Sequence, residues 1–280
     1  MFENVWAVYF SGTGTTQKAV TTIANEIGEK KGLSVKVFDF TKPKNRENQL
    51  AFTEKDIVVF GMPVIAGRVP NLMLKYLNGK IDGGGAIGVP VVLYGNRNFD
   101  DGLIELRDML QDHGFKTVAA GAFVGEHSFS DILGKNRPDE KDLGLARNLG
   151  DKVCEIANCL EQGGEVETPV QVPGVEKPYR EYYKPRDRHG NHIDIRKVKP
   201  KTDKEKCVNC KLCANICPLG SIDFDDVSNI AGICMKCCGC VKKCPQGAKY
   251  FDDPGYIYHK EELEAMYQRY GESQIFSGTF

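Results

Sequence analysis

The chain has 280 residues, which is long enough for two domains, and 27% of them are charged. The net charge is −1 and both signs are mixed along the chain, which argues against nucleic acid or an anionic membrane as a partner. No apolar run approaches the roughly 18 residues that span a bilayer, and the first residues do not resemble a secretion signal. We therefore expect a cytoplasmic protein, in which the eleven cysteines indicate a reducing compartment.

The chain begins with an apolar strand at residues 5–10, a loop of small and hydroxylic residues at 11–16, and a helix at 17–30. Such a loop is typical of a phosphate site, because its N–H groups and hydroxyls donate to phosphate oxygens. It lacks the Gly-Lys-Ser/Thr ending of an ATP-binding loop and the third glycine of the dinucleotide fingerprint. The loop therefore fits a terminal monophosphate such as that of FMN. An ordinary Gly/Thr-rich turn into a helix is the alternative.

Strands and helices then alternate as far as residue 160. We expect four further strands, at 33–40, 56–60, 86–94 and 116–124, and three further helices, at 71–77, 103–113 and 139–160. Each parallel crossover needs a covering helix, so this order predicts an α/β fold with a doubly wound five-stranded parallel sheet. Ligands of such sheets bind beyond the carboxyl ends of the strands.

Residues 1–162 resemble a flavodoxin, and we expect them to form the first domain. The resemblance implies FMN, with its phosphate in the first loop and its isoalloxazine ring between the loops that follow the third and fourth strands. The implied phosphate residues are Ser11, Thr13, Gly14, Thr15 and Thr16. The implied ring-flanking residues are Pro63, Val64, Ile65, Ala66 and Gly67 in one loop and Gly95, Asn96, Arg97 and Phe99 in the other. Unlike many flavodoxins, the first of these two loops has no Trp or Tyr to stack on the ring.

Residues 163–198 are the expected linker, because their glycines and prolines favour an extended chain. Residues 171–201 contain nine Lys/Arg and four Asp/Glu, a net charge of +5 (9 − 4). Such a segment is a solvated connector, a cover over the first domain, or a docking face for an acidic redox partner.

Two identical cysteine runs, each C-x2-C-x2-C-x3-C-P, start 27 residues apart (234 − 207). This is the ligand pattern of bacterial two-cluster ferredoxins, in which the fourth cysteine of each run binds the other [4Fe–4S] cluster. The first predicted ligand set is Cys207, Cys210, Cys213 and Cys244, and the second is Cys234, Cys237, Cys240 and Cys217. Zinc is the main alternative, but it usually pairs C-x2-C units without a third cysteine three residues on. Cys238 lies inside the second run, and it either supports the cluster from outside or competes for one of its corners.

Residues 199–255 resemble these small ferredoxins over nearly their whole length, which implies a small α+β domain with two clusters. Residues 256–280 form the expected tail, with a short amphipathic helix at 260–270. His127, which follows the last strand of the first domain, either lines an interface with the clusters or is an ordinary loop histidine.

Together the two halves resemble the flavodoxin–ferredoxin fusion proteins of anaerobes. The resemblance implies electron transfer between FMN, which takes two electrons, and two clusters that each move one. We expect an electron carrier that meets redox partner proteins, either a ferredoxin-type donor or acceptor or a downstream reductase. One alternative is a flavin-dependent reductase, fed by its own ferredoxin domain, that acts on a quinone, a corrinoid protein or a metal complex. A redox sensor or scaffold with structural clusters is the other. No nicotinamide site is evident.

Overall fold

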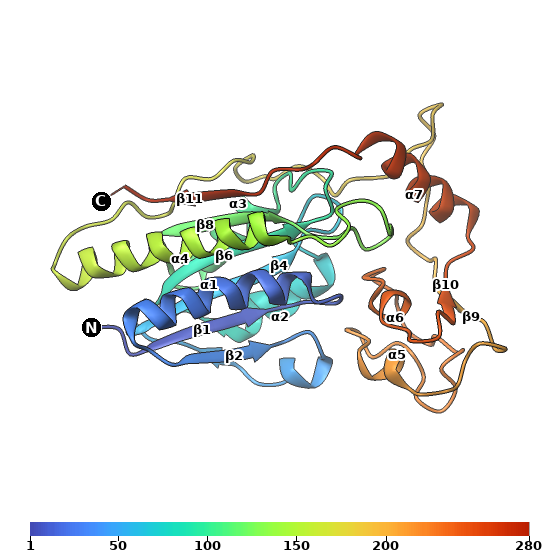
Figure 1. Ribbon diagram of the computed structural model, residues 1–280, viewed down its shortest axis with the longest axis horizontal. Helices are drawn as coiled ribbons and strands as arrows, with labels where there is room; N and C mark the ends of the chain where they lie inside the picture. Colours follow the sequence, from blue (N-terminus) through green and yellow to red (C-terminus); the bar gives the residue numbers. More distant parts are fainter. Residues whose placement is uncertain (280) are drawn as a thin grey trace.

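The computed structural model describes residues 1–279, which form a larger part built around a sheet and a smaller part that carries the cysteine runs (Figure 1). Five parallel strands run in the order β2-β1-β4-β6-β8. They are β1 (Asn4–Tyr9), β2 (Val35–Asp39), β4 (Asp56–Pro63), β6 (Ile87–Tyr94) and β8 (Ala119–Val124). Counted along the chain, this is the 2-1-3-4-5 order of flavodoxin-like sheets. The predicted doubly wound α/β fold is confirmed.

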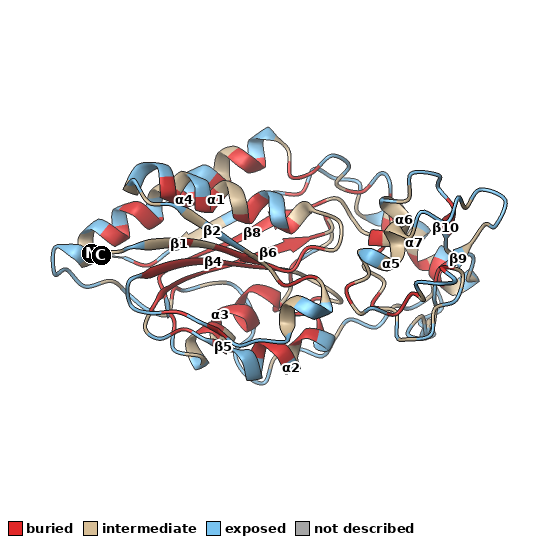
Figure 2. Cartoon of the chain, turned by 90° about the horizontal axis from the view of Figure 1, so that it is seen from below, coloured by how far each residue is buried: buried red, intermediate tan, exposed pale blue. Residues whose placement is uncertain are grey.

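Four helices cover this sheet, two on each face (Figure 2). Figure 2 shows α1 (Thr15–Lys31) and α4 (Glu140–Glu161) on one side, and α2 (Asn71–Lys80) and α3 (Gly102–Asp112) on the other. Every residue of β6 is buried, because helices cover both of its faces. This explains why the inner strands have continuous apolar sequences instead of an alternating pattern. A 3-10 turn at Pro43–Arg46 (η1) and a short parallel pair, β3 (Leu50–Ala51) with β5 (Ile81–Asp82), lie beside the main sheet.

The sheet also contains two strands that we did not predict. β7 (Lys116–Thr117) pairs with the start of β6, so the expected strand at 116–124 is divided in two. β11 (Gln274–Ser277), from the end of the chain, pairs antiparallel with β8 at the edge of the sheet. We expected only a helix in the tail, because four residues with one partner strand give too weak a sequence pattern to detect. The tail therefore returns to the first part of the molecule, as the dark red strand in Figure 1 shows.

The smaller part has little regular structure. It contains one antiparallel pair, β9 (Lys201–Thr202) with β10 (Lys249–Tyr250), and two one-turn helices, α5 (Leu212–Asn215) and α6 (Gly239–Lys242). The tail helix α7 (Pro254–Met266) begins six residues before the predicted start at residue 260 and does not extend to residue 270. Asp253 caps this helix by accepting a hydrogen bond from the Tyr256 N–H, and Pro254 occupies its first position.

The linker at 163–198 contains no helix or strand and packs on the first part of the chain. Val170 is fully buried, and its N–H donates to the Thr117 carbonyl at 2.8 Å. The Asp101 carboxylate accepts hydrogen bonds from the Val175 N–H at 3.0 Å and the Arg180 N–H at 2.8 Å. The basic segment thus packs along the first part, as one of the three possibilities has it, while most of its residues stay exposed. Among the described residues, no helix is both long and apolar enough to cross a membrane.

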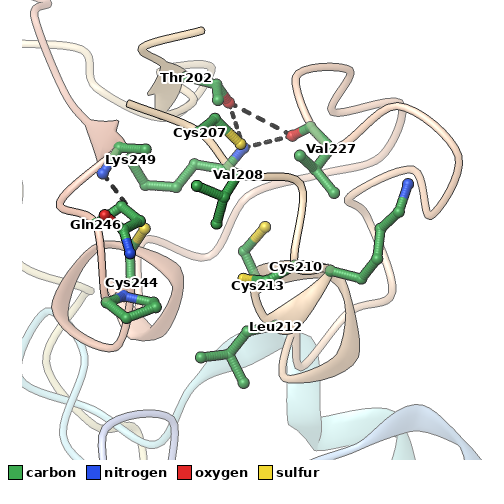
Figure 3. A pocket seen from close by; sticks show the side chains of 13 residues that line it. Thr202, Cys207, Val208, Cys210, Leu212, Cys213, Val227, Cys244, Gln246 and Lys249 are labelled. Atoms are coloured by element: carbon green, nitrogen blue, oxygen red, sulfur yellow. Dashed lines mark hydrogen bonds between the residues drawn. The ribbon is translucent and has the colours of Figure 1, made fainter. Parts of the chain in front are cut away.

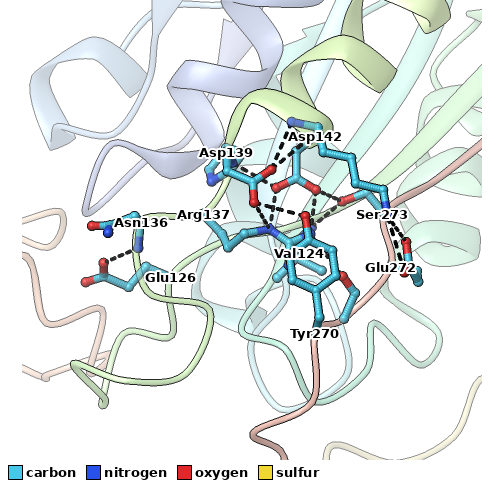
Figure 4. A network of polar contacts seen from close by, with 12 residues as sticks. Val124, Glu126, Asn136, Arg137, Asp139, Asp142, Tyr270, Glu272 and Ser273 are labelled. Atoms are coloured by element: carbon cyan, nitrogen blue, oxygen red, sulfur yellow. Dashed lines mark hydrogen bonds and ion pairs between the residues drawn. The ribbon is translucent and has the colours of Figure 1, made fainter.

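A buried ion pair ties the tail to the body of the molecule (Figure 4). Arg137 and Asp142 are 6% and 2% exposed, and the Arg137 Nη2 donates to the Asp142 carboxylate at 2.6 Å and to the Gly271 carbonyl at 2.9 Å. The Ser273 hydroxyl donates to the same carboxylate at 2.6 Å, and the Tyr270 ring lies 3.9 Å from the guanidinium carbon of Arg137. Because both residues of the pair are buried away from water, removing either one leaves the charge of the other poorly compensated.

We expect Asp142→Ala to lower the free energy of unfolding by about 3–5 kcal/mol, because it removes the buried carboxylate from Arg137 and leaves only the partly exposed Asp139, 3.5 Å away. Glu155→Ala is the control, since it breaks the exposed Glu155–Lys152 pair, a change of about 0.5 kcal/mol or less. Urea unfolding followed by circular dichroism measures both variants. Equal losses in the two would contradict a structural role for the buried pair.

Candidate functional site

The eight predicted ligand cysteines line two separate cavities in the smaller part. The first cavity is lined by Cys207, Cys210, Cys213 and Cys244 (Figure 3). The second is lined by Cys217, Cys234, Cys237 and Cys240. The second cavity is also lined by Cys238, so four of its five thiols come from the second run. Each predicted ligand set still takes three thiols from one run and one from the other, which is the arrangement of two-cluster ferredoxins. The cavities contain about 350 and 420 Å³ of space free of protein atoms, part of it open to solvent.

The two runs follow the same backbone path. Left-handed residues occur at three pairs of positions 27 residues apart: Asn209 and Lys236, Lys211 and Cys238, and Gly220 and Gly247. Residues with positive φ reverse the chain tightly, so a short loop can bring three thiols to one cavity. The repeat in the sequence is therefore also a repeat in conformation.

Backbone N–H groups donate to sulfur at equivalent places in both runs. The Ser221 N–H lies 3.3 Å from the Cys217 Sγ, and the Ala248 N–H lies 3.3 Å from the Cys244 Sγ. Burial opposes ionisation of Cys244, but the N–H groups of residues 246–249 outweigh it and lower the pKa of this thiol. Iron binds the thiolate, and hydrogen bonds to sulfur tune the potential of a cluster. These loops thus suit the ligands of an iron–sulfur centre.

The second cavity is drier than the first. Burial raises the pKa of Cys237 to about 11 and also raises the pKa of Cys240, so iron must displace protons when a cluster forms there. In the first cavity, by contrast, Cys210 is exposed. The ammonium of Lys249 is buried there between Thr202 and Val227, and it donates to the Thr202 hydroxyl at 2.7 Å (Figure 3).

Within residues 1–279, no three His, Cys, Asp or Glu side chains converge on a point where one metal ion would sit. A single zinc ion would hold its sulfurs about 2.3 Å from the metal, whereas a cubane spreads four thiolates around a larger body. The thiols of one predicted ligand set line each cavity, and they are the donor type that a [4Fe–4S] cluster needs.

The predicted phosphate loop lies at the carboxyl end of β1. Helix α1 follows it directly, and Gly14, with φ 107°, stands at the helix start without a side-chain cap. The Ser11 hydroxyl accepts from the Gln17 N–H at 3.1 Å, while the Ser11 N–H donates to the Thr41 hydroxyl at 2.8 Å. Ser11 thus satisfies the third N–H of α1, and a phosphate would satisfy the N–H groups of Thr15 and Thr16 before it. The loop therefore fits an anionic group.

The first ring-flanking loop follows β4. The Ile65 N–H and the Arg68 carbonyl pair at 3.0 Å, which closes a tight turn with Ala66 at φ 52°. The Ala66 carbonyl accepts a hydrogen bond from the Tyr183 N–H at 2.8 Å. The linker thus reaches the edge of this loop.

The second ring-flanking loop is bound by the tail. The Asn96 amide donates to the Tyr267 carbonyl at 2.6 Å and to the Arg269 carbonyl at 2.7 Å, and its oxygen accepts from the Gly271 N–H at 3.1 Å. Phe99 is buried against Tyr94, with ring centroids 5.5 Å apart. The Asn96 side chain therefore hydrogen-bonds to the tail, so the backbone of this loop is the part available to contact a flavin ring. No sequence pattern indicated this contact, which joins residues more than 170 positions apart.

His127 lies at the boundary between the two parts of the molecule. Its ring packs so closely on Gly95 that a Cβ there would lie 2.2 Å from the His127 Cδ2. The His127 Nδ1 accepts from the Phe129 N–H at 3.1 Å, and burial lowers the pKa of His127 to about 4. Of the two interpretations of this residue, these contacts fit the neutral, hydrogen-bonded loop histidine.

The phosphate loop touches the second cysteine run directly. A Cβ on Gly12 would lie 3.0 Å from the Cys237 Cβ and 3.3 Å from its Sγ, and a Cβ on Gly239 would lie 2.7 Å from the Gly12 carbonyl oxygen. Met235, from the same run, is buried in the core beneath α2 and α3. Of the two cavities, the second is the one beside the phosphate loop.

Comparisons with known proteins give one family match and several distant structural likenesses. The family described as 4Fe-4S binding domain matches residues 200–223, which contain the first cysteine run. No curated protein matches the chain. Among solved structures, a flavodoxin from the domain Archaea is 20% identical, with 55% of this chain and 99% of that one covered and a TM-score of 0.41.

Two further solved structures cover the same half. The flavodoxin of Streptococcus pneumonia TIGR4 is 16% identical, covers 55% of this chain and 99% of its own, and has a TM-score of 0.40. The rubredoxin oxygen:oxidoreductase of Desulfovibrio gigas is 15% identical, covers 56% of this chain and 36% of its own, and has a TM-score of 0.39. These likenesses are distant, and the strand order itself defines the fold.

The chain thus combines a flavodoxin-like α/β fold, defined by its strand order, with a segment that matches a 4Fe-4S binding domain. The match to the 4Fe-4S binding domain supports at least one iron–sulfur cluster in this protein.

The glycine contact gives a direct test. We expect Gly239→Ala to lower the free energy of unfolding by about 1–3 kcal/mol, because the new methyl meets the Gly12 backbone at 2.7 Å and forces the two loops apart. Gly144→Ala is the matched control, since a Cβ there meets nothing within 4 Å and helix α4 gains about 0.5–1 kcal/mol. Urea unfolding compares the two variants. A stable Gly239→Ala protein would contradict the close approach.

Proposed function

We propose that this protein relays electrons between FMN and two [4Fe–4S] clusters as a carrier without a substrate of its own. The observation that supports this most directly is the contact of the phosphate loop with the second cysteine run at Gly12 and Cys237. Each cluster moves one electron and FMN takes two, so their combination joins one-electron partners to two-electron chemistry.

The proposed FMN phosphate ligands are the loop residues Ser11, Thr13, Gly14, Thr15 and Thr16. The chain at 63–67 and 95–99 then encloses the ring, with the linker at Ala66 and the tail at Asn96 fixing these loops from outside. The cysteine sets that line the two cavities are the proposed cluster ligands. This chain's own task is to keep the three cofactors at fixed separations and to exclude water from the second cavity.

We further propose an order for the relay. The second cluster is the one next to FMN, because Cys237 contacts Gly12. The first cluster is the one that a partner protein meets, because Cys210 is exposed and Val208, which lines that cavity, is 63% exposed. Electrons then pass between the partner, the first cluster, the second cluster and FMN in that order or its reverse.

A flavin-dependent reductase is the second candidate, and one observation favours it. An open cavity of about 660 Å³ lies in the linker, lined by Glu181, Tyr182, Tyr183, Lys184, Arg186 and His192. Tyr183 also bonds to Ala66 and stacks under the Arg97 guanidinium at 4.7 Å, so this cavity adjoins both ring-flanking loops. A quinone, a corrinoid protein or a metal complex would meet the flavin edge here.

Cofactor analysis tests the proposal. Protein purified without oxygen should contain about eight iron atoms, about eight sulfide ions and one FMN per chain, because two cubanes hold four irons each. Metal analysis, sulfide assay and the flavin absorbance spectrum of the native protein measure these. Zinc in place of iron, or a preparation that retains no flavin, would contradict the proposal.

The exchange of ligands between runs is tested separately by Cys217→Ser. This change should damage the second cluster, whose other three ligands come from residues 234–240, because Cys217 lines that cavity. EPR of the reduced protein distinguishes the clusters, and Cys244→Ser, which should damage the first cluster, is the matched control. Loss of only the first cluster in Cys217→Ser would refute the exchange.

A further inference from the structure

Aromatic side chains form a continuous line between the second cavity and the second ring-flanking loop. Phe251 lines the cavity and stacks on Tyr256, with ring centroids 4.2 Å apart and planes 17° from parallel. Tyr256 in turn contacts Phe129 at 4.6 Å, and Phe129 meets the His127 ring edge-on at 5.4 Å. His127 packs on Gly95, the first residue of the loop. Four side chains thus join the cavity to the loop.

A branch of this line reaches the other ring-flanking loop. His259, from the same helix as Tyr256, lies 6.3 Å from Phe129 and is stacked 5.9 Å from Tyr183. The Tyr183 N–H donates to the Ala66 carbonyl. His259 is 5% exposed, so the branch is shielded from water at the point where it leaves the line of aromatic side chains. Both loops therefore connect to helix α7.

Tyr256 is the member of the line that also bonds to the cysteine run. Its hydroxyl lies 3.4 Å from the Sγ of Cys238, the cysteine of the second run that belongs to neither predicted ligand set. Tyr256 and Cys238 are 4% and 3% exposed. A buried hydroxyl needs a hydrogen-bond partner. The partner of the Tyr256 hydroxyl is Cys238, which follows the predicted ligand Cys237 directly in the chain. The tail helix is thereby fixed to the wall of the second cavity.

We propose that Tyr256 is a positioning residue for electron transfer between the second cluster and the flavin. Its hydroxyl fixes the wall of the second cavity, and its ring, packed between Phe251 and Phe129, is the contact through which the electron passes. In that step one electron leaves the second cluster and enters the flavin, while no bond forms or breaks. This inference rests on the proposed function, and it gives Cys238 the role of a hydrogen-bond partner instead of a ligand.

The phosphate loop offers a competing route, since Gly12 also contacts Cys237. That contact joins the Gly12 backbone to the side chain of Cys237 without an aromatic ring, and it lies at the phosphate end of the proposed flavin site. Only the aromatic route needs the Tyr256 ring, so an experiment that removes this ring separates the two routes.

The experiment measures how fast the flavin is reduced after a light pulse reduces the clusters of the anaerobic, cofactor-loaded protein. Tyr256→Leu, which removes the ring, should slow this step about tenfold or more, as the loss of a residue that supports a metal site does. Tyr256→Phe keeps the ring, so it should keep the rate but shift the reduction potential of the second cluster in an EPR titration, because a hydrogen bond next to the cluster is lost. Tyr258→Leu, on the same helix and outside the line, should change neither.

Iron, sulfide and flavin contents of each variant show whether the cofactors are retained. If the cofactors are retained, an unchanged rate of flavin reduction in Tyr256→Leu overturns the inference. Electrons would then pass through the contact between Gly12 and Cys237, and the proposed function would still hold. If Tyr256→Leu loses iron, Phe129→Leu, which lies outside the cysteine runs, decides the question by the same rate. A wild-type protein that binds no flavin would instead refute the proposed function.

Discussion

The contact between Gly12 and Gly239 governs how the two parts of the molecule meet. A Cβ on either residue would be forced against the opposite loop, at 3.0 Å from Cys237 in one case and 2.7 Å from the Gly12 carbonyl in the other. Glycine at both positions therefore lets two backbones approach where side chains would keep them apart. Charged side chains secure the same seam from the outside, since the Lys242 ammonium donates to the Ser130 carbonyl at 2.7 Å. The second cavity consequently lies beside the phosphate loop.

The linker and the tail make this arrangement a single unit. After leaving the sheet, the chain covers α3, reaches Ala66 and enters the cysteine runs. It then returns through α7, binds Asn96 and ends in the first sheet as β11. Both loops expected to flank a ring are thus held by segments that lie outside the sheet. A flavodoxin-like domain alone would lack these contacts, so the environment of the two loops depends on the whole chain.

The sequence was sufficient for features that depend on local pattern. Apolar runs and helical periodicity predicted the five parallel strands, and cysteine spacing predicted which thiols share a cavity, because both follow from short stretches of chain. The start of α7 was also readable from Asp253 and Pro254 but was placed too late. By contrast, β11, the Asn96 contacts and the pairing of Tyr256 with Phe129 join residues more than 100 positions apart. Only the folded chain brings them together.

The central claim is that the cluster bound by the second set of cysteines lies against the phosphate loop of the flavin site. Diffraction from crystals grown without oxygen, recorded at the iron absorption edge, locates iron without assuming any ligand. The account predicts two separate iron peaks, one of them enclosed by Cys217, Cys234, Cys237 and Cys240 next to Gly12, with FMN density beginning at residues 11–16. A single peak, or iron found only in the cavity of Cys207, would contradict it.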